Sequence, residues 1–127
     1  MNLLLDTDRL TDALRGEPSV IALLEGASAV RVPFIALAEL RAGFLLGRRR
    51  RENEAALNRF LALPGVDPVF ADQDTIEVYA RLFAYLRKAG TPIPTNDLWI
   101  ASLAVQHRWP LLTRDAHFRK LPQIVQA

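Results

Sequence analysis

Short runs of hydrophobic residues alternate along the chain with longer segments in which hydrophobic residues recur at helical spacing. The short runs predict strands at residues 3–5, 30–32, 69–70, 111–113 and 123–125. The longer segments predict helices over residues 7–14, 19–24, 34–46, 50–63, 72–89 and 95–107, with one further helical turn over 116–120. Strands that alternate with helices are typical of a parallel sheet covered on both faces, so the pattern predicts an α/β fold.

Helix start and stop residues support two of these boundaries. Asp72 or Asp74 is placed to cap the long helix that ends before Gly90, where glycine is a favoured terminator. Thr95 or Asn96 is placed to cap the following helix. These signals predict both helix starts to within a few residues.

Length and composition limit the class of protein. The 127 residues are half hydrophobic and 24% charged, so we expect one globular domain over residues 1–127. No apolar run approaches the ~20 residues of a membrane span, and Asp6 and Asp8 follow too closely on the first leucines for an ordinary signal peptide. The absence of cysteine excludes disulfides, thiolate metal sites and a catalytic thiol. We therefore expect a cytoplasmic protein.

Positive charge gathers in one segment of a nearly neutral chain. The net charge is +2, but residues 41–59 hold six arginines and only two glutamates. A basic segment of this kind suits a polyanion, and it is equally typical of a solvated surface.

Four of the 14 acidic residues stand alone within or directly after apolar segments. They are Asp6, Glu39, Asp97 and Asp115. Asp6 and Asp115 follow predicted strands, whereas Glu39 and Asp97 lie near the starts of predicted helices. Because ligands of parallel sheets bind beyond the carboxyl ends of the strands, we expect all four side chains to converge at one sheet edge.

Four carboxylates in one pocket repel each other unless a cation neutralises them. With no cysteine and only two histidines in the chain, the expected ligands are oxygen atoms. Such ligands favour Mg²⁺ or Mn²⁺ over zinc or copper, and these ions are typical of nuclease and phosphoryl-transfer chemistry.

The four acids lie in segments that resemble the successive motifs of PIN-domain ribonucleases, and within that family the VapC-type toxins of type II toxin–antitoxin pairs. The segments are LLLDT at 3–7, AELRAG at 38–43, TNDLWIA at 95–101 and LTRDAHF at 112–118. The resemblance covers nearly the whole chain. It implies a three-layer α/β/α sandwich with a short, mainly parallel central sheet of four or five strands. It also implies an endoribonuclease that uses one or two Mg²⁺ or Mn²⁺ ions and is inhibited by a cognate antitoxin.

The resemblance also assigns roles to individual residues. Asp6, Glu39, Asp97 and Asp115 fall on the metal-binding and catalytic acids, and Thr7, Asn96 and Thr113 fall on polar neighbours that orient the acids or the water. Asp8 departs from the pattern, because the family usually has Asn or Ser there, and we interpret it as a further residue beside the metal ligands. We expect the reaction to be attack by a metal-activated water on the RNA phosphate, which leaves one product with a 5′-phosphate and the other with a 3′-hydroxyl.

Arginines supply the expected contacts to RNA. Arg41 and Arg114 adjoin two of the acids and are the candidates for contact near the reacting phosphate. Arg48 and Arg49 lie in the basic segment and can contact RNA phosphates or an acidic stretch of the antitoxin. The resemblance implies a homodimer and a groove for an antitoxin helix, and the numerous apolar residues of the predicted helices 34–46 and 50–63 fit that implication.

Two other interpretations stay open. Asp6-Thr7-Asp8 imitates the Asp-x-Asp opening of haloacid-dehalogenase-type phosphotransferases, in which the first acid is the nucleophile, although Leu10 and the short chain fit that family poorly. A catalytically silent PIN-like binding module is the second alternative. Both histidines and both tryptophans are interpreted as structural.

Overall fold

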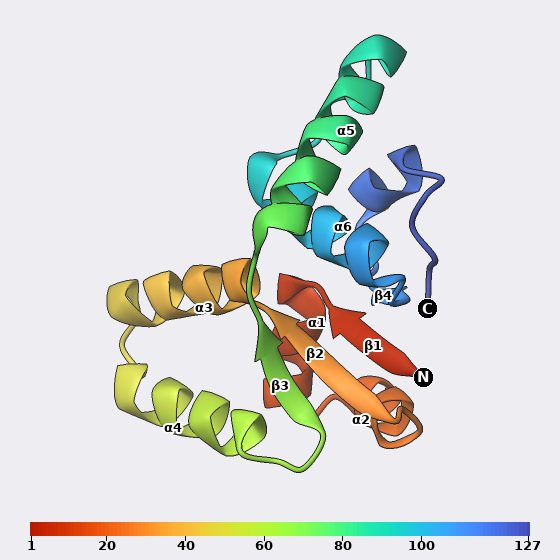
Figure 1. The fold of residues 1–127 in the computed structure, drawn as a ribbon. Coiled ribbons are helices and arrows are strands. Elements are labelled where there is room, and N and C mark those ends of the chain that lie inside the picture. The colour runs from red at the N-terminus through yellow and green to blue at the C-terminus, as the bar shows by residue number, and fades with distance from the viewer.

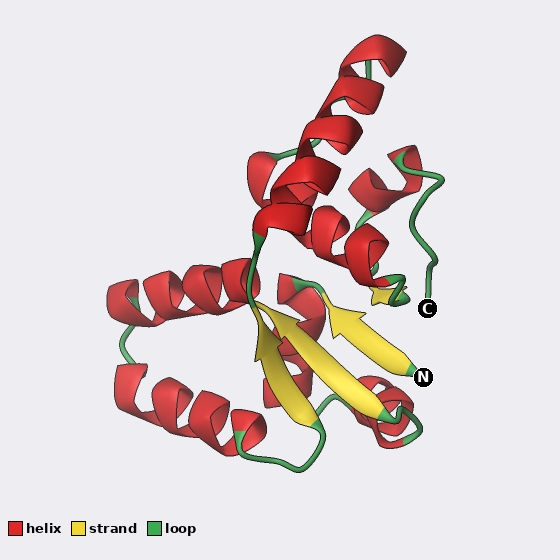
Figure 2. Cartoon of the chain, viewed as in Figure 1, coloured by secondary structure: helices red, strands yellow, loops and turns green.

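The computed structural model describes residues 1–127 as a four-stranded sheet with six α-helices and one 3₁₀ helix. The strands are β1 (Asn2–Leu5), β2 (Ala29–Pro33), β3 (Val66–Val69) and β4 (Leu111–Leu112). The helices are α1 (Thr7–Leu14), α2 (Pro18–Glu25), α3 (Phe34–Leu46), α4 (Arg50–Leu61), α5 (Gln73–Ala89), α6 (Thr95–His107) and η1 (Ala116–Lys120). The predicted alternation of strands and helices is confirmed (Figures 1 and 2).

All strands of the sheet are parallel, in the order β3-β2-β1-β4. Leu3 lies opposite Val30, and Leu4 lies opposite Leu111. The chain adds β2 and β3 on one side of β1 and later places β4 on the other side. The order of strands therefore reverses between β1 and β4, and parallel sheets bind ligands at the carboxyl ends of strands beside such a reversal.

Helices cover both faces of the sheet, which makes the expected three-layer sandwich. One hydrophobic core contains Leu5 of β1 together with residues of α1, α2, α3 and α4, among them Leu10 and Leu57. The other contains Leu4 with residues of α5, α6 and η1, among them Leu103 and Phe118. Neighbouring residues of one strand face opposite sides, so Leu4 and Leu5 each anchor one core.

The predicted capping residues are confirmed for α5 but not for α6. Asp72 caps α5 in a reciprocal capping box with Thr75, and Gly90 ends that helix in the left-handed conformation with φ 70°. At α6 the prediction was wrong, because Pro94 is the N-cap residue and no side chain caps the helix. The fixed φ of proline leads the chain straight into the first turn.

Two strand predictions were also wrong. The third strand is Val66–Val69 and pairs with β2, whereas Phe70 lies beyond the pairing and is exposed. Pro68 hid this strand in the sequence, because proline is tolerated only on an edge strand such as β3. The last strand is reduced to a single bridge between Leu111 and Gln126. None of the helices is both long and apolar enough for a membrane span.

Candidate active site

Asp6 joins the ends of β1 and β4. It directly follows β1 and caps α1, where its carboxylate accepts a hydrogen bond from the backbone N–H of Arg9 at 2.9 Å. The Thr113 hydroxyl, just beyond β4, donates to the other carboxylate oxygen of Asp6. The same hydroxyl accepts the backbone N–H of Asp115 at 2.9 Å. Asp6 is buried, with 4% of its surface exposed, so these donors replace water.

Asp97 and Asp115 meet beside His117. Asp97 lies in the first turn of α6, and Asp115 caps η1 by accepting the backbone N–H of His117 at 2.9 Å. The His117 Nδ1 atom is 2.9 Å from an Asp97 oxygen and 3.2 Å from an Asp115 oxygen. One ligand atom from each of the three residues lies within 4.8 Å of the others. The cluster is thus built from two segments that are close only in the folded chain.

Glu39 reaches the same region from α3. The Thr7 hydroxyl, at the start of α1, donates to the Glu39 carboxylate at 2.7 Å. The charge of Glu39 is also one of the causes that raise the pKa of Asp97. The structure therefore brings Glu39, Asp97 and Asp115 into one electrostatic neighbourhood, with Asp6 and Thr113 joined to it through Asp115.

Burial opposes the ionised forms of two of these acids. Burial is the main cause that raises the pKa of Asp6, and the nearby charge of Asp8 adds to it, while hydrogen bonds from Thr113 and Arg9 lower it. Burial likewise raises the pKa of Asp97, the His117 hydrogen bond lowers it, and the charges of Asp115 and Glu39 raise it. A cation held among these carboxylates would favour their ionised forms and so lower the pKa of both acids.

The residues fit a divalent cation. Two carboxylates and one imidazole converge, and oxygen ligands favour Mg²⁺ and Mn²⁺. The structure departs here from the expected set of oxygen atoms only, because His117 adds a nitrogen to the group. The interpretation of His117 as a structural residue did not anticipate this position, because His117 lies in a short terminal turn and in no ligand spacing. His107, by contrast, stacks on Trp109 with ring centroids 4.2 Å apart, as a structural role requires.

The other predicted neighbours are less engaged. Asp8 and Asn96 are exposed, and their side chains make no hydrogen bond within the chain. Asp8 nevertheless acts on Asp6 through its charge. Thr7 and Thr113 are the two polar neighbours that contact acids directly.

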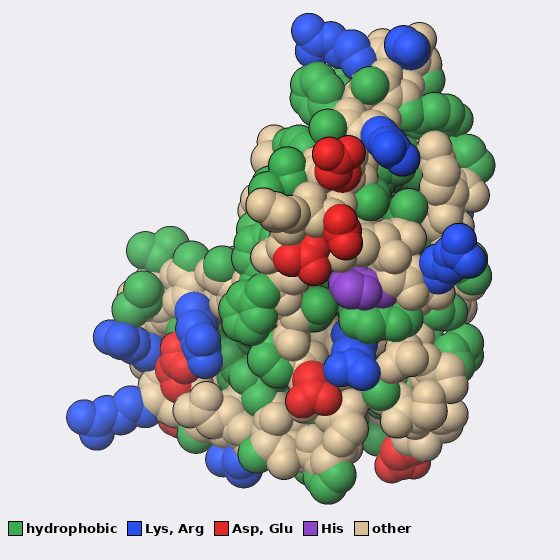
Figure 3. Space-filling model, in the orientation of Figure 1, with side chains coloured by type: hydrophobic (Ala, Val, Ile, Leu, Met, Phe, Trp, Pro, Cys, Tyr) green, Lys and Arg blue, Asp and Glu red, His purple; other side chains and the backbone are tan.

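The predicted arginines lie at different places. Arg41 extends to α4 and pairs with Glu54 at 3.5 Å, because residues two apart on a helix point in different directions and only Glu39 faces the acids. Arg49 pairs with Glu52, and Arg48 is exposed. Basic side chains gather at the end of the hairpin that α3 and α4 form (Figure 3). This basic segment is therefore separate from the acids.

One charged cluster beside the acids was not predicted. Asp12 of α1 is buried, and one of its oxygens lies 3.0 Å from Arg114 Nη1 and 3.4 Å from Arg9 Nη1. Asp12 and Arg114 are 102 positions apart, so no local pattern indicates the pair. Of the four predicted arginines, Arg114 is the one whose neighbours on both sides contact the acids, through Thr113 and Asp115.

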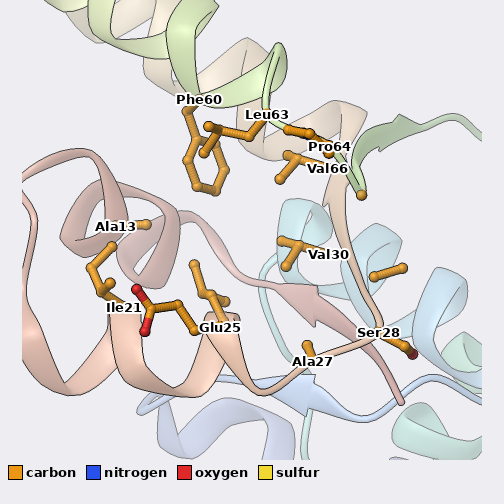
Figure 4. Close-up of a pocket in the computed structure, with 13 residues that line it drawn as sticks. Ala13, Ile21, Glu25, Ala27, Ser28, Val30, Phe60, Leu63, Pro64 and Val66 are labelled. Carbon is orange, nitrogen blue, oxygen red and sulfur yellow. The ribbon is translucent and has the colours of Figure 1, made fainter.

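The largest pocket lies elsewhere. It has a volume of about 440 Å³. Its lining is mostly apolar and comes from helices α1, α2 and α4 and from the first residues of strands β2 and β3. Figure 4 shows Phe60, Val30 and Val66 facing this space, with Glu25 at its side. The starts of parallel strands are at the opposite edge from their carboxyl ends, so this pocket is separate from the acidic site.

Known proteins match this chain over nearly its whole length. The PIN domain family matches residues 3–124. Ribonuclease VapC4 of Mycobacterium tuberculosis is 30% identical over 113 residues, which cover 89% of this chain and 84% of that protein. Toxin FitB of Neisseria gonorrhoeae is 30% identical over 126 residues, covering 89% of this chain and 87% of that protein.

Solved structures agree with the sequence match. A structure of VapBC2 from Rickettsia felis, bound to a DNA fragment from the promoter, contains a chain that is 25% identical with a TM-score of 0.90. The match covers 100% of this chain and 98% of that one. The family match leaves the haloacid-dehalogenase alternative without support. The chain belongs to the PIN domain family.

Proposed function

We propose that this protein is a metal-dependent endoribonuclease, the toxin of a toxin–antitoxin pair, formed as a single PIN domain over residues 1–127. The observation that carries the proposal is the convergence of Asp6, Glu39, Asp97 and Asp115 at the carboxyl edge of β1 and β4. The relatives support it, since the chain matches proteins named as ribonucleases and as a toxin over most of its length.

The acids are proposed as the catalytic metal site. Asp97 and Asp115, with His117 beside them, would hold Mg²⁺ or Mn²⁺, and Asp6 and Glu39 would complete the site. Such an ion lowers the pKa of water and stabilises charge on a phosphate. The chain itself supplies orientation: the Thr7 hydroxyl holds Glu39, and the Thr113 hydroxyl holds Asp6. The backbone N–H of His117 holds Asp115.

The proposed partners are an RNA substrate, a cognate antitoxin and a second copy of the chain. A structure that this chain resembles is a VapBC complex, which supports the antitoxin. Leu45 and Leu46 at the end of α3 are 61% and 91% exposed, which supports a further protein contact. Light scattering checks the dimer, and a mass that stays at 14.2 kDa at all concentrations contradicts it. Cytoplasmic localisation remains part of the proposal.

The experiment is cleavage of total bacterial RNA by the purified protein with Mg²⁺ or Mn²⁺. EDTA removes the metal, and Asp97→Asn is the control for contaminating ribonuclease. We expect discrete fragments that require the metal, are absent with Asp97→Asn, and carry 5′-phosphate and 3′-hydroxyl ends. Fragments with 2′,3′-cyclic phosphate ends would contradict attack by water, because those ends form when the ribose 2′-hydroxyl attacks.

A catalytically silent binding module predicts a different result. Folded, antitoxin-free protein that neither cleaves RNA nor binds Mn²⁺ in calorimetry would reject the enzyme. Protein that binds Mn²⁺ without cleaving total RNA would direct the search to a narrower substrate.

A further inference from the structure

We propose that Asp12 is a positioning residue that holds Arg114 at the rim of the acidic site, where Arg114 binds a phosphate of the RNA. The inference rests on the proposed function and adds to it the group that attracts the substrate. Asp12 itself is too buried to contact a substrate, with 8% of its surface exposed.

The position of Arg114 is the first argument. It lies between Thr113, whose hydroxyl donates to Asp6, and Asp115, which belongs to the carboxylate cluster. The site is otherwise rich in negative charge, which opposes the approach of a polyanion. A cation at its rim reverses that effect locally.

The hydrogen-bonding capacity of Arg114 is the second argument. A guanidinium has five N–H donors, and within the chain only one nitrogen of Arg114 is engaged, with Asp12 at 3.0 Å. The side chain is 57% exposed while that of Asp12 is 11% exposed. One end of the guanidinium is thus anchored and the other faces solvent, which is the arrangement that suits a phosphate oxygen.

The sharing of Asp12 by two arginines is the third argument. One Asp12 oxygen contacts both Arg114 and Arg9, so Arg114 shares its carboxylate partner with a second guanidinium. Arg9 is mostly buried, and its Nε atom has no hydrogen-bond partner. Arg114 is the more exposed of the two guanidinium groups, so it is the one that a phosphate in solution can reach.

A purely structural clamp between α1 and the loop after β4 is the alternative. It predicts that loss of Arg114 lowers the free energy of unfolding and leaves RNA binding by the folded protein unchanged. Our inference predicts a loss of RNA affinity that depends on salt. The two are separated by measuring binding and unfolding on the same variants.

The test measures binding of a fluorescein-labelled, short, mixed-sequence single-stranded RNA over a range of salt concentrations. All variants carry Asp97→Asn, so that binding is read without cleavage. We expect Arg114→Ala to weaken binding about tenfold and to reduce the slope of log affinity against log salt by about 0.7, the value for one phosphate contact on a single strand. Arg114→Lys should restore part of the RNA affinity and part of the salt slope. Arg31→Ala removes the same charge toward the opposite edge of the sheet, where Arg31 pairs with Asp67 and contacts Asn2 at the start of β1, and should change neither.

Asp12→Asn tests the positioning role. It should weaken binding in the presence of Arg114 and add nothing in the Arg114→Ala background, because Asp12 acts only through Arg114. Asp67→Asn removes a carboxylate that pairs with Arg31 on the exposed surface and is the matched control. Urea unfolding of each variant verifies that it is folded. Should Asp12→Asn fail to fold, the Arg114 variants decide alone, because Arg114→Ala leaves Asp12 paired with Arg9.

Each outcome is decisive. If the reference protein binds RNA and Arg114→Ala binds it equally well, the inference is overturned and the proposed function stays intact. Additive losses for Asp12→Asn and Arg114→Ala overturn the positioning role. If the reference protein fails to bind RNA at any salt concentration, the proposed substrate falls, and with it the inference.

Discussion

The Thr113 hydroxyl connects two of the proposed catalytic acids, and its removal is the sharpest test of how the site is held together. The hydroxyl donates to Asp6 and accepts the backbone N–H of Asp115. Thr113→Val keeps the shape of the side chain and removes only these two hydrogen bonds. The variant therefore measures the contacts without a change in packing volume.

The structure gives the size of the effect. The bond to the Asp6 carboxylate is charge-assisted, and the loss of such a bond costs about 1.5–3 kcal/mol of unfolding free energy. The loss of the neutral bond to Asp115 costs about 0.5–1.5 kcal/mol. Asp6 is only 4% exposed, so water cannot replace the lost donor. We expect Thr113→Val to lower the free energy of unfolding by about 2–4 kcal/mol, and Tm by about 4 °C for each kcal/mol.

Urea denaturation of the metal-free protein measures the change, and Thr113→Ser is the matched control because it keeps the hydroxyl. The effect has a defined pH dependence. Burial raises the pKa of Asp6, and the Thr113 hydroxyl opposes that rise, so the pKa of Asp6 is higher still in Thr113→Val. The difference in stability is full while Asp6 is ionised in both proteins. It narrows as the pH falls through the folded pKa of Asp6 in the variant.

Two results would refute this reasoning. One is an equal loss of stability in Thr113→Ser and Thr113→Val, which would assign the effect to packing. The other is a loss in Thr113→Val that stays constant from neutral pH down to the unfolded pKa of Asp. Either result would mean that the hydroxyl does not stabilise the Asp6 carboxylate.

Three further predictions concern the metal, the acids and the backbone. Saturating Mn²⁺ should stabilise the protein by about 3 kcal/mol at a hundredfold excess over the dissociation constant; His117→Ala should reduce the thermal shift, and His107→Ala, on the Trp109 stack, should not. Because burial raises the pKa of Asp97, its ionised form destabilises the fold above that pKa. Asp97→Asn should therefore increase metal-free stability at neutral pH by about 1 kcal/mol, and this gain should vanish as the pH falls toward 3.8; an unchanged stability profile would contradict the burial argument. Gly90→Ala should cost about 1 kcal/mol from strain at positive φ, whereas Gly43→Ala, in helix α3 with open space around it, should stabilise by about the same amount; chemical denaturation that ranks the two in the opposite order would contradict the backbone argument.

The sequence predicted the strands and helices in which buried residues recur at a regular spacing. Leu4 and Leu5 alternate between the two cores, and the helices of each layer carry their apolar residues at helical spacing. The rule that ligands bind beyond the carboxyl ends of parallel strands then placed Asp6 and Asp115 together, because both follow strands that prove to be neighbours. These predictions succeeded because each depends on local pattern plus one general rule of sheet topology.

The missed features depend on contacts between distant segments. Asp12 looked like any polar residue of an amphipathic helix, and only the fold places Arg114 beside it. His117 acquires its position from the cap that Asp115 forms at η1, a geometry that no spacing motif encodes. The last strand failed for a related reason, since pairing with β4 is confined to one bridge at Gln126.

The proposed site balances its own charge incompletely, and this has a consequence for function. Each acid has a donor from the chain: Thr113 for Asp6, Thr7 for Glu39, the His117 ring for Asp97 and the His117 backbone N–H for Asp115. Burial still raises the pKa of Asp6 and Asp97 despite these donors. The donors thus orient the carboxylates without neutralising them. A cation bound at the proposed site would owe its affinity to the same burial that lowers the stability of the metal-free fold. Substitutions that strengthen the metal-free protein at these positions should for that reason weaken its hold on the metal.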